Sequence, residues 1–304
     1  MAEHKTENVP NLFVIGVAKS GTTSLFQWLS DHPEIGASRD RETRHLMDAD
    51  DDLCHSGGYA DNGLQGYADL FADRIGSGGI RYLIDVSPQY YYQETALNVI
   101  PSLASKKVIL ILRKPSSRLY SLFRYASHNL SILPDDMGFP GFVEHLHLGR
   151  NSPLFQGKRM LEDALLHNQY AMYIRQWALQ LEPQDFHICQ FDDLKNDPLQ
   201  FARRLAKFLG IDPEFYTTYS FRAENKSVAI RNKRLHRLIR RFRARIPAPL
   251  RRRLKPLYMA ANSTKPARSI PAGDQAALAA LDAHFLGWEK DLSIVLKRSP
   301  PFRH

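Results

Sequence analysis

Cysteines and long apolar runs are both scarce in this sequence of 304 residues. The two cysteines, Cys54 and Cys189, lie far apart and have no metal-ligand pattern near them, so we expect neither a disulfide framework nor a metal site. The longest apolar stretches, such as residues 108–112, are strand-sized and far below the roughly 20 residues that a membrane-spanning helix needs. The first 11 residues are polar and lack the apolar core of an export signal. The sequence therefore favours a cytoplasmic protein that does not span a membrane.

Positive charge is in excess, with 41 Lys and Arg against 32 Asp and Glu and a net charge of +9, but the excess is local. Residues 231–255 hold 12 Lys or Arg and no acidic residue, and their first part has the spacing of an amphipathic helix. Two interpretations stay open. The segment is either the solvated face of a core-packed helix, or a surface that attaches peripherally to an anionic membrane or another polyanion. No recognition motif accompanies the charge, so we expect no nucleic acid partner.

Hydrophobic periodicity predicts strands that alternate with helices. Short and nearly continuous apolar runs, typical of strands buried on both faces, predict strands at 12–15, 82–85, 107–112 and 186–191. Helical spacing and capping residues predict helices at 22–32, 116–125 and 198–209, and a long amphipathic stretch covers 161–181. This alternation implies an α/β fold: a parallel sheet flanked by helices, with right-handed crossovers.

The chain shows no internal repeat and no low-complexity linker, so we expect one domain over residues 1–304. Its core would cover about 11–211, and a helical, basic C-terminal part about 212–304, with helices at 231–245 and 274–297. The segments 49–79 and 129–159 are rich in Gly, Asp, Pro and His and weakly periodic. We expect them to be irregular loops that face the substrate.

The strongest chemical signal lies between the first strand and the first helix, in Gly16-Val-Ala-Lys19-Ser20-Gly21-Thr22-Thr23. Its two glycines have the spacing of the nucleotide-binding loop G-x-x-x-x-G-K-[ST]. Glycines let the backbone curl so that successive N–H groups point at a phosphate, beside the N-terminus of a helix. However, Thr22 takes the place of the lysine of nucleoside triphosphatases, and the lysine stands three residues earlier. The loop therefore predicts an anion site with a different chemistry.

This loop resembles the 5′-phosphosulfate loop of sulfotransferases that use 3′-phosphoadenosine 5′-phosphosulfate as donor. A second block, from Val108 through Arg113 to Ser121, resembles the 3′-phosphate motif of the same family, a strand that ends in Arg with Ser eight residues later. The resemblance covers roughly residues 11–211 and implies a P-loop-type parallel β-sheet. An arginine fork at a strand end and a hydroxyl two helical turns further on suit the oxygens of a phosphate. Arg113 and Ser121 would thus hold the 3′-phosphate.

The resemblance also implies the roles of the loop residues in sulfuryl transfer. Lys19 would stabilise the charge that builds on the departing 5′-phosphate, because a compact ammonium lies at the centre of the loop. The loop amides, including that of Gly21, and the hydroxyls of Ser20, Thr22 and Thr23 would hold that phosphate. The donor carries no triphosphate, so we expect no metal ion.

An acceptor hydroxyl or amine must lose a proton, which requires a general base. Residues 41–47 resemble the K-E-x-x-F-F segment of sulfotransferases that act on carbohydrates, where the glutamate is taken as the base, so Glu42 is our candidate. His45 and Leu46 stand where two aromatic residues are usual. His45 remains an alternative base because imidazole titrates near neutral pH, and Glu42 could instead form an ordinary ion pair with Arg41 or Arg44.

Two further positions follow from the resemblance. Asp85, with the Ser-Pro that follows its strand, corresponds to a block that lines the site near the donor sulfate. It would orient Lys19 or the acceptor, or it would cap the next helix. Lys226 lies where the family often has a loop that closes over the 3′-phosphate, so we add it to the donor-binding residues.

The leading hypothesis is a sulfotransferase that moves a sulfuryl group to a hydroxyl or amine of a glycan, glycolipid or small molecule. A P-loop nucleotide kinase or nucleoside triphosphatase is the second, although Thr22 in place of the lysine argues against it. A non-catalytic protein that binds a membrane or polyanion through residues 231–255 is the third.

Overall fold

The computed structural model describes residues 8–38, 40–74, 78–130, 132–221, 229–230, 263–264 and 270–298. Lys226, the basic segment 231–255 and the helix predicted within it lie outside the described residues. Contacts divide the chain into two compact units. Unit 1 comprises Met1–Lys114, Leu166–Glu224 and Leu286–His304, and unit 2 comprises Pro115–Leu165 and Asn225–Phe285. The single domain over 1–304 stays a prediction.

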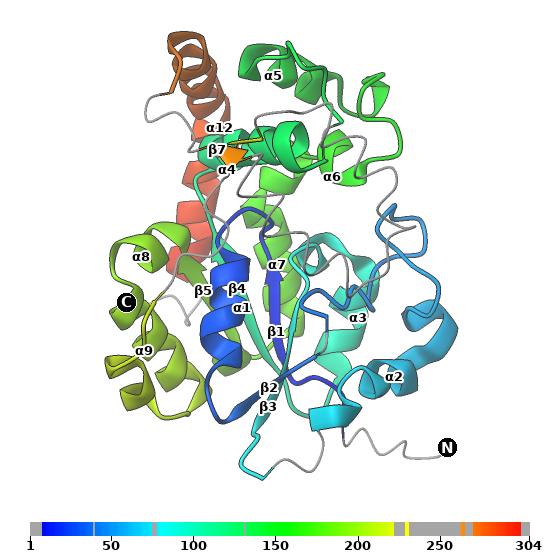
Figure 1. Ribbon diagram of the computed structural model, residues 1–304, viewed down its shortest axis with the longest axis vertical. Helices are drawn as coiled ribbons and strands as arrows, with labels where there is room; N and C mark the ends of the chain where they lie inside the picture. Colours follow the sequence, from blue (N-terminus) through cyan, green and yellow to red (C-terminus); the bar gives the residue numbers. More distant parts are fainter. Residues whose placement is uncertain are drawn as a thin grey trace. The chain divides into compact units, whose positions relative to one another are not determined.

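Unit 1 is built on a five-stranded sheet in the order β2-β3-β1-β4-β5 (Figure 1). The strands are β1 (Leu12–Gly16), β2 (Ile35–Ala37), β3 (Tyr82–Val86), β4 (Lys107–Leu112) and β5 (Phe186–Gln190). All four neighbouring pairs are parallel. The predicted parallel α/β fold is confirmed, and four of the strands lie within a residue of their predicted bounds. β2 was not predicted, because its three residues, one of them a glycine, give no periodic signal.

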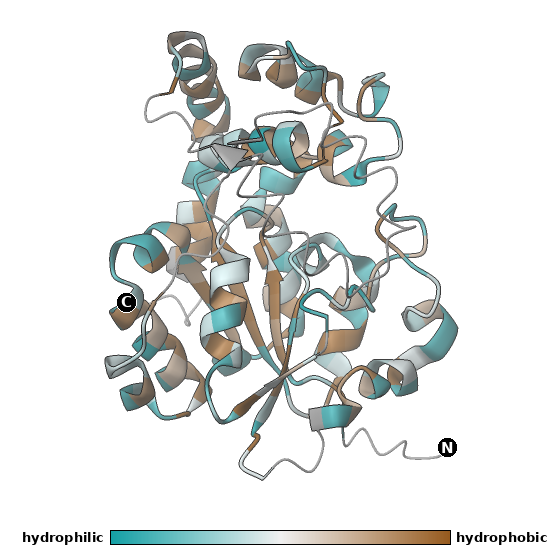
Figure 2. Ribbon diagram, in the orientation of Figure 1, coloured by the Kyte–Doolittle hydropathy of each residue, from teal (hydrophilic) through white to brown (hydrophobic). Residues whose placement is uncertain are grey.

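Side chains of the central strands alternate between two hydrophobic cores, one on each face of the sheet. On β1, Leu12 and Val14 join one core, whereas Phe13 and Ile15 join the other. β4 alternates in the same way. Because successive side chains of a strand point to opposite faces, a strand covered on both sides must be apolar at every position. Figure 2 accordingly shows the strands as the apolar centre of unit 1.

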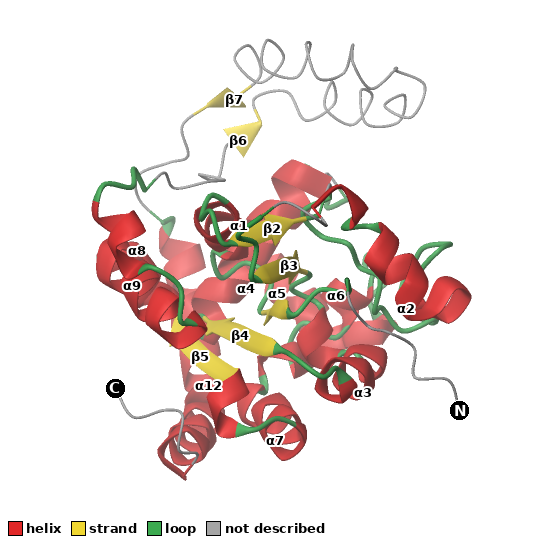
Figure 3. Ribbon diagram, turned by 90° about the horizontal axis from the view of Figure 1, so that it is seen from below, coloured by secondary structure: helices red, strands yellow, loops and turns green. Residues whose placement is uncertain are grey.

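Helices of unit 1 supply the opposite walls of these two cores, and Figure 3 shows the sheet between them. α1 (Thr22–Ser30) and α9 (Pro198–Leu209) pack with Leu12 and Val14. α3 (Glu94–Ser102) and α7 (Tyr170–Gln180) pack on the other face. α9 ends as predicted at Gly210, whose φ of 64° is a left-handed conformation that glycine adopts readily. Unit 1 also contains α2 (Tyr59–Asp69), α8 (Phe191–Asn196) and the second half of α12 (Ala272–Arg298).

Over its described residues, unit 2 is mostly helical and also holds the short antiparallel strand pair β6 (Ala229–Ile230) and β7 (Ser263–Thr264). It contains α4 (Pro115–Arg124), the π-helix η3 (Tyr125–Leu130), α5 (Phe139–Leu148), α6 (Arg159–Glu162) and the first half of α12 (Ala272–Arg298). Rings of α4 and α5 pack together, with Tyr120 edge-on to Phe139 at 4.9 Å between centroids. The Tyr120 hydroxyl donates to Asp274 on α12 at 3.0 Å.

Two segments predicted to be irregular contain helices. α2 lies within 49–79, and α5 lies within 129–159. Glycines inside both helices, and the non-helical φ of 56° at Gly63, weaken the local helical pattern. α3 was also not predicted, and the stretch 161–181 is divided into short turns and α7. Tertiary packing, rather than local preference, fixes these elements.

His187 on β5 generates a prediction about stability and pH. Burial, with Arg204 nearby, lowers the pKa of this imidazole from its ordinary value of 6.5 to about 4. The folded chain therefore keeps His187 neutral at pH 5, where the unfolded chain would protonate it, so stability falls as pH drops from 6.5 towards 4. Replacing His187 with Leu should reduce the loss of unfolding free energy between pH 7.5 and pH 5 by about 1–2 kcal/mol.

Urea unfolding at the two pH values measures this difference. The substitution His147→Gln, at an exposed histidine on α5, is the matched control. If the unfolding free energy falls by the same amount between pH 7.5 and pH 5 in His187→Leu and in the unchanged chain, the prediction is wrong.

Candidate functional site

The blocks that carry the predicted site meet at one edge of the sheet. β1 pairs in parallel with both β3 and β4, so the three strands end on the same side. The phosphate loop follows β1, Ser87 follows β3, and Arg113 follows β4. The start of the loop packs tightly, since a Cβ on Gly16 would meet the ring of Tyr91 at 2.8 Å. Ligands of open α/β sheets bind at this carboxyl edge, where neighbouring connections diverge to either side.

Left-handed backbone conformations shape the phosphate loop. Lys19 has φ 75° and Gly21 has φ 85°. Glycine adopts this conformation without penalty, whereas a lysine does so at a cost of about 1–3 kcal/mol, which is typical of functional loops. The amide of Val17 donates to the carbonyl of Ile111 on β4 at 2.9 Å and fixes the loop to the sheet. α1 begins at Thr22, and the amides of its first turn have no acceptor within the helix.

Ser20 provides the clearest sign of a ligand. Its side chain is fully buried, yet its Oγ has no hydrogen-bond partner among the described residues. Such a buried hydroxyl costs about 1–3 kcal/mol, which a bound oxygen atom would offset. Lys19 is half-buried beside it, Thr22 is buried, and Thr23 is half-buried. The five predicted loop residues are together because they are consecutive in the chain.

The structure brings Arg113 to this loop. Its Nη1 donates to the carbonyl oxygen of Lys19 at 2.8 Å, and its guanidinium lies 4.5 Å from the centroid of the Phe191 ring. The Tyr170 hydroxyl donates to the backbone oxygen of Arg113 at 3.0 Å. The same Phe191 ring lies against Gly21, where a Cβ would approach it to 3.0 Å. Arg113, Phe191 and the loop thus support one another.

Ser121, the other residue predicted to contact the 3′-phosphate, is half-buried on α4. It belongs to unit 2, whereas Arg113 belongs to unit 1. Their joint contact with one phosphate stays a prediction, as does the role of Lys226.

Glu42 forms ion pairs with two arginines. Its Oε1 lies 2.9 Å from Nη2 of Arg41, and its Oε2 lies 2.7 Å from Nη2 of Arg44. Each contact occupies one lone pair of one carboxylate oxygen, so each oxygen can accept a further hydrogen bond. The ion pairs with Arg41 or Arg44 that we gave as the alternative for Glu42 are therefore present, and they orient the carboxylate while leaving each of its oxygens able to accept a further hydrogen bond.

His45, the alternative base, is almost completely buried. Its Nε2 lies 2.8 Å from the carbonyl oxygen of Gly63, and its ring stacks on Tyr67 with 4.6 Å between centroids. Burial lowers the pKa of the imidazole below its ordinary value. These contacts favour Glu42 over His45 as the group that faces an acceptor.

Asp85 is buried and accepts hydrogen bonds from four hydroxyls. The donors lie 2.5–3.0 Å from its carboxylate oxygens and belong to Thr43, Tyr67, Ser87 and Tyr90. Burial raises the pKa of the Asp85 carboxyl above its ordinary value, and these hydrogen bonds oppose the rise. The four donors lie outside the phosphate loop, and no side chain caps the following 3-10 helix η2 (Tyr90–Tyr92). The structure thus connects Asp85 to the segment that carries Glu42 rather than to the phosphate loop.

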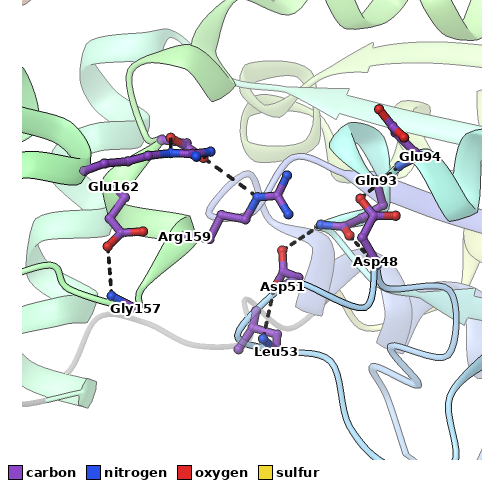
Figure 4. A network of polar contacts seen from close by, with 10 residues as sticks. Asp48, Asp51, Leu53, Gln93, Glu94, Gly157, Arg159 and Glu162 are labelled. Atoms are coloured by element: carbon purple, nitrogen blue, oxygen red, sulfur yellow. Dashed lines mark hydrogen bonds and ion pairs between the residues drawn. The ribbon is translucent and has the colours of Figure 1, made fainter. Parts of the chain in front are cut away.

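The next part of the chain is fixed to the start of α3, as Figure 4 shows. The Gln93 side chain accepts from the amide of Asp48 at 2.7 Å and donates to the Asp51 carboxylate at 2.8 Å. Asp48 in turn accepts from the amides of Glu94 and Thr95, at 3.1 and 2.8 Å. The part of the chain that follows Glu42 is therefore tied to the rest of unit 1 at Thr43 and again at residues 48–51.

Over the described ranges, no group of three or more His, Cys, Asp or Glu side chains could hold a metal ion. None of the helices in the described part of the chain is both long enough and apolar enough to cross a membrane.

Comparison with known proteins agrees with this geometry. The model of the sulfotransferase domain matches residues 9–237, which is most of the chain and includes the phosphate loop, Glu42, Arg113 and Ser121. The chain belongs to the sulfotransferase family. The family prediction from the two motifs is thereby confirmed, and with it the predicted class of enzyme.

Individual sulfotransferases resemble parts of the chain. It is 27% identical over 216 residues to the mouse bifunctional heparan sulfate N-deacetylase/N-sulfotransferase 4, covering 70% of this chain and 24% of the mouse protein. It is 30% identical over 125 residues to the membrane-associated sulfotransferase kil1 of Dictyostelium discoideum, covering 41% of this chain and 24% of the other. The chain thus spans about a quarter of the length of the curated relatives it matches.

A solved sulfotransferase has the same fold. The crystal structure of the enzyme from Alicyclobacillus acidocaldarius superposes with a TM-score of 0.57 at 21% identity, covering 90% of this chain and 95% of that one. At this identity the likeness bears on the fold, which it confirms.

Two residues that support the candidate site were not predicted from the sequence. Phe191 supports Arg113 and Gly21, and a signal was present, because an aromatic residue directly follows β5 at the carboxyl edge. Thr43, between Glu42 and Arg44, gave no signal, because only the fold shows its hydrogen bond to a strand 42 residues away.

Gly21 generates a prediction about the loop. Alanine there would be strained at φ 85°, and its Cβ would press on the Phe191 ring that supports Arg113. We expect Gly21→Ala to weaken the binding of 3′,5′-ADP about tenfold or more, because a shift of about 1 Å in a positioning group has effects of this size. Calorimetric titration measures the change.

The matched control is Gly79→Ala, which has a similar φ of 91° and no atom within 4 Å of the added Cβ. It should cost similar stability without changing binding. If both variants and the unchanged chain bind 3′,5′-ADP with equal affinity, Gly21 does not have the proposed role in shaping the loop.

Proposed function

We propose that the chain transfers a sulfuryl group from 3′-phosphoadenosine 5′-phosphosulfate to a hydroxyl or amine of a carbohydrate-like acceptor. The observation that carries this proposal is the buried Ser20 hydroxyl without a described partner, in a left-handed loop next to Lys19 and Arg113. Membership of the sulfotransferase family supports it.

The residues at the loop fit the donor. The Ser20 hydroxyl and the first-turn amides of α1 would bind oxygens of the 5′-phosphate, with the Thr22 and Thr23 hydroxyls beside them. Arg113 would bind the 3′-phosphate, because a planar guanidinium can donate two parallel hydrogen bonds to a phosphate. One of its nitrogens already donates to the Lys19 carbonyl, so the two phosphate-binding groups have a fixed relative position. Ser121 and Lys226 complete the set as predicted from the family motif.

The reaction forms a bond between the acceptor atom and sulfur and breaks the bond between sulfur and the bridging oxygen of the 5′-phosphate. Lys19 stabilises the negative charge that develops on that oxygen. Glu42 accepts the proton of the acceptor hydroxyl or amine. Its ion pairs with Arg41 and Arg44 hold the carboxylate in place for that transfer.

The acceptor class rests on two observations. The curated relatives include enzymes named for heparan sulfate N-sulfotransfer. In addition, Glu42 lies in the segment that resembles that of carbohydrate sulfotransferases. We also propose that the chain is cytoplasmic and that residues 231–255 attach it peripherally to an anionic surface.

Lys19→Ala tests the reaction. With labelled donor and a panel of glycan acceptors, the unchanged chain should form sulfated product and 3′,5′-ADP. Lys19→Ala should lower kcat about 10²–10³-fold, since it removes stabilisation made mainly in the transition state. The exposed Lys195→Ala on α8 is the control and should leave kcat unchanged.

Calorimetry separates this proposal from the kinase alternative. Tight binding of 3′,5′-ADP and much weaker binding of 5′-AMP would support recognition of the 3′-phosphate. Preferential binding of Mg·ATP, or normal turnover in Lys19→Ala, would overturn the proposal.

Glu42→Gln tests the base. Glutamine keeps the size of the side chain and its hydrogen bonds to arginine, but it cannot take up a proton. We expect kcat to fall about 10²–10⁴-fold while the affinity for 3′,5′-ADP stays the same. Single-turnover sulfation assays and calorimetry measure the two quantities, with the exposed Glu182→Gln as control. If His45→Gln proves more damaging to kcat than Glu42→Gln, His45 is the base.

A further inference from the structure

Three consecutive backbone amides, directly after the Glu42-Thr43 pair, donate to three side-chain hydroxyls. The Arg44 amide donates to Ser87 Oγ at 3.1 Å, the His45 amide to Thr43 Oγ1 at 3.3 Å, and the Leu46 amide to the Tyr90 hydroxyl at 3.0 Å. Each of the three hydroxyls donates its own proton to Asp85. The three amides thus reach Asp85 through one hydroxyl each.

A carboxylate is suited to this arrangement because it only accepts hydrogen bonds. Its negative charge turns the protons of the surrounding hydroxyls towards it, which leaves the lone pairs of the hydroxyl oxygens facing away. Burial and the nearby Asp85 charge raise the pKa of Tyr90, so its phenol keeps the proton that it donates. The oxygens are therefore fixed as acceptors for the amides. An uncharged residue at position 85 would let each hydroxyl rotate.

The backbone between the amides explains why such support is needed. Arg44 has φ 53°, a left-handed conformation that is unfavourable for a side chain with a Cβ. The fold must therefore stabilise this turn, and Arg44 also carries one of the guanidinium groups that bind Glu42. Release of the turn would displace Arg44 and with it the Glu42 carboxylate.

We propose that Asp85 is a positioning residue that fixes the turn at residues 44–46 through the hydroxyls of Thr43, Ser87 and Tyr90 and thereby sets the place of Glu42. This inference rests on the proposed function for the role of Glu42 as base, but the support of the turn does not depend on it. Asp85 would act through these hydroxyls rather than on the reacting atoms.

Two tyrosines of the same cluster give a matched pair of variants. Both Tyr67 and Tyr90 are buried and donate to Oδ2 of Asp85, but only the Tyr90 hydroxyl also accepts from an amide of the turn. We expect Tyr90→Phe to speed hydrogen exchange of the amides at 44–46 and to lower kcat about tenfold, with KM nearly unchanged. Tyr67→Phe keeps the ring that stacks on His45, and it should leave both quantities within about threefold of the unchanged chain.

Thr43 provides a second pair in case Tyr90→Phe fails to fold. Thr43→Val has nearly the same shape without the hydroxyl, whereas Thr43→Ser keeps it. Thr43→Val should reproduce the faster exchange and lower kcat, and Thr43→Ser should restore both. If the loss of side-chain volume were the cause, Thr43→Ser would show faster exchange and a lower kcat than Thr43→Val.

Exchange is followed by mass spectrometry on the full chain, and kcat by sulfation of a glycan acceptor. Unchanged exchange at 44–46 in Tyr90→Phe and Thr43→Val would overturn the inference. Faster exchange with unchanged kcat would overturn the link to Glu42. A chain without any sulfuryl transfer would overturn the proposed function instead, while the exchange rates would still decide whether Asp85 fixes the turn.

Discussion

The parallel pairing of β1 with β3 and with β4 is the constraint on which the site depends. Because all three strands run in one direction, the segments that leave them start at the same edge, although they are far apart in sequence. The loop at Lys19, the Ser87 hydroxyl and the Arg113 guanidinium are thereby placed near one another before any side chain makes a specific contact. The two hydrophobic cores make this pairing rigid, since every residue of β1 is buried between them.

A second constraint is the buried charge of Asp85. An ionised carboxylate removed from water costs several kcal/mol unless hydrogen bonds compensate for it, and hydrogen bonds to charged groups contribute about 1.5–3 kcal/mol each. Four hydroxyls from three separate parts of the chain provide that compensation. The carboxylate therefore holds together segments that the sheet alone does not join: the turn after Glu42, α2 and the end of β3. The need to compensate the buried charge of Asp85 therefore orders the three segments around it.

The donor-binding side of the candidate site could be predicted from sequence, because most of its residues are close together in the chain. Gly16 to Thr23 are consecutive, so one sequence pattern carries both their loop conformation and their predicted function. Arg113 directly follows β4, an apolar run that is easy to recognise. The side of the site around Glu42 could be predicted only in part. The resemblance identified Glu42, but the hydrogen bonds of Asp85 span up to 42 residues and leave no periodic trace in the sequence. β2 was not predicted because it is three residues long and includes a glycine, and α3 was not predicted because part of its packing, against α7, involves a distant part of the chain.

This difference bears on how such a site can change its substrate. A donor loop made of consecutive residues and closed by Arg113 and Phe191 depends on few other parts of the chain. The turn that carries Glu42 is fixed by long-range contacts to Asp85 and, through Asp48 and Gln93, to the start of α3. Substitutions in the loop 48–58 can therefore alter the surroundings of the proposed base without touching the phosphate loop. In the proposed reaction the donor can stay the same while the acceptor changes, because the two sides of the candidate site are stabilised by separate sets of contacts.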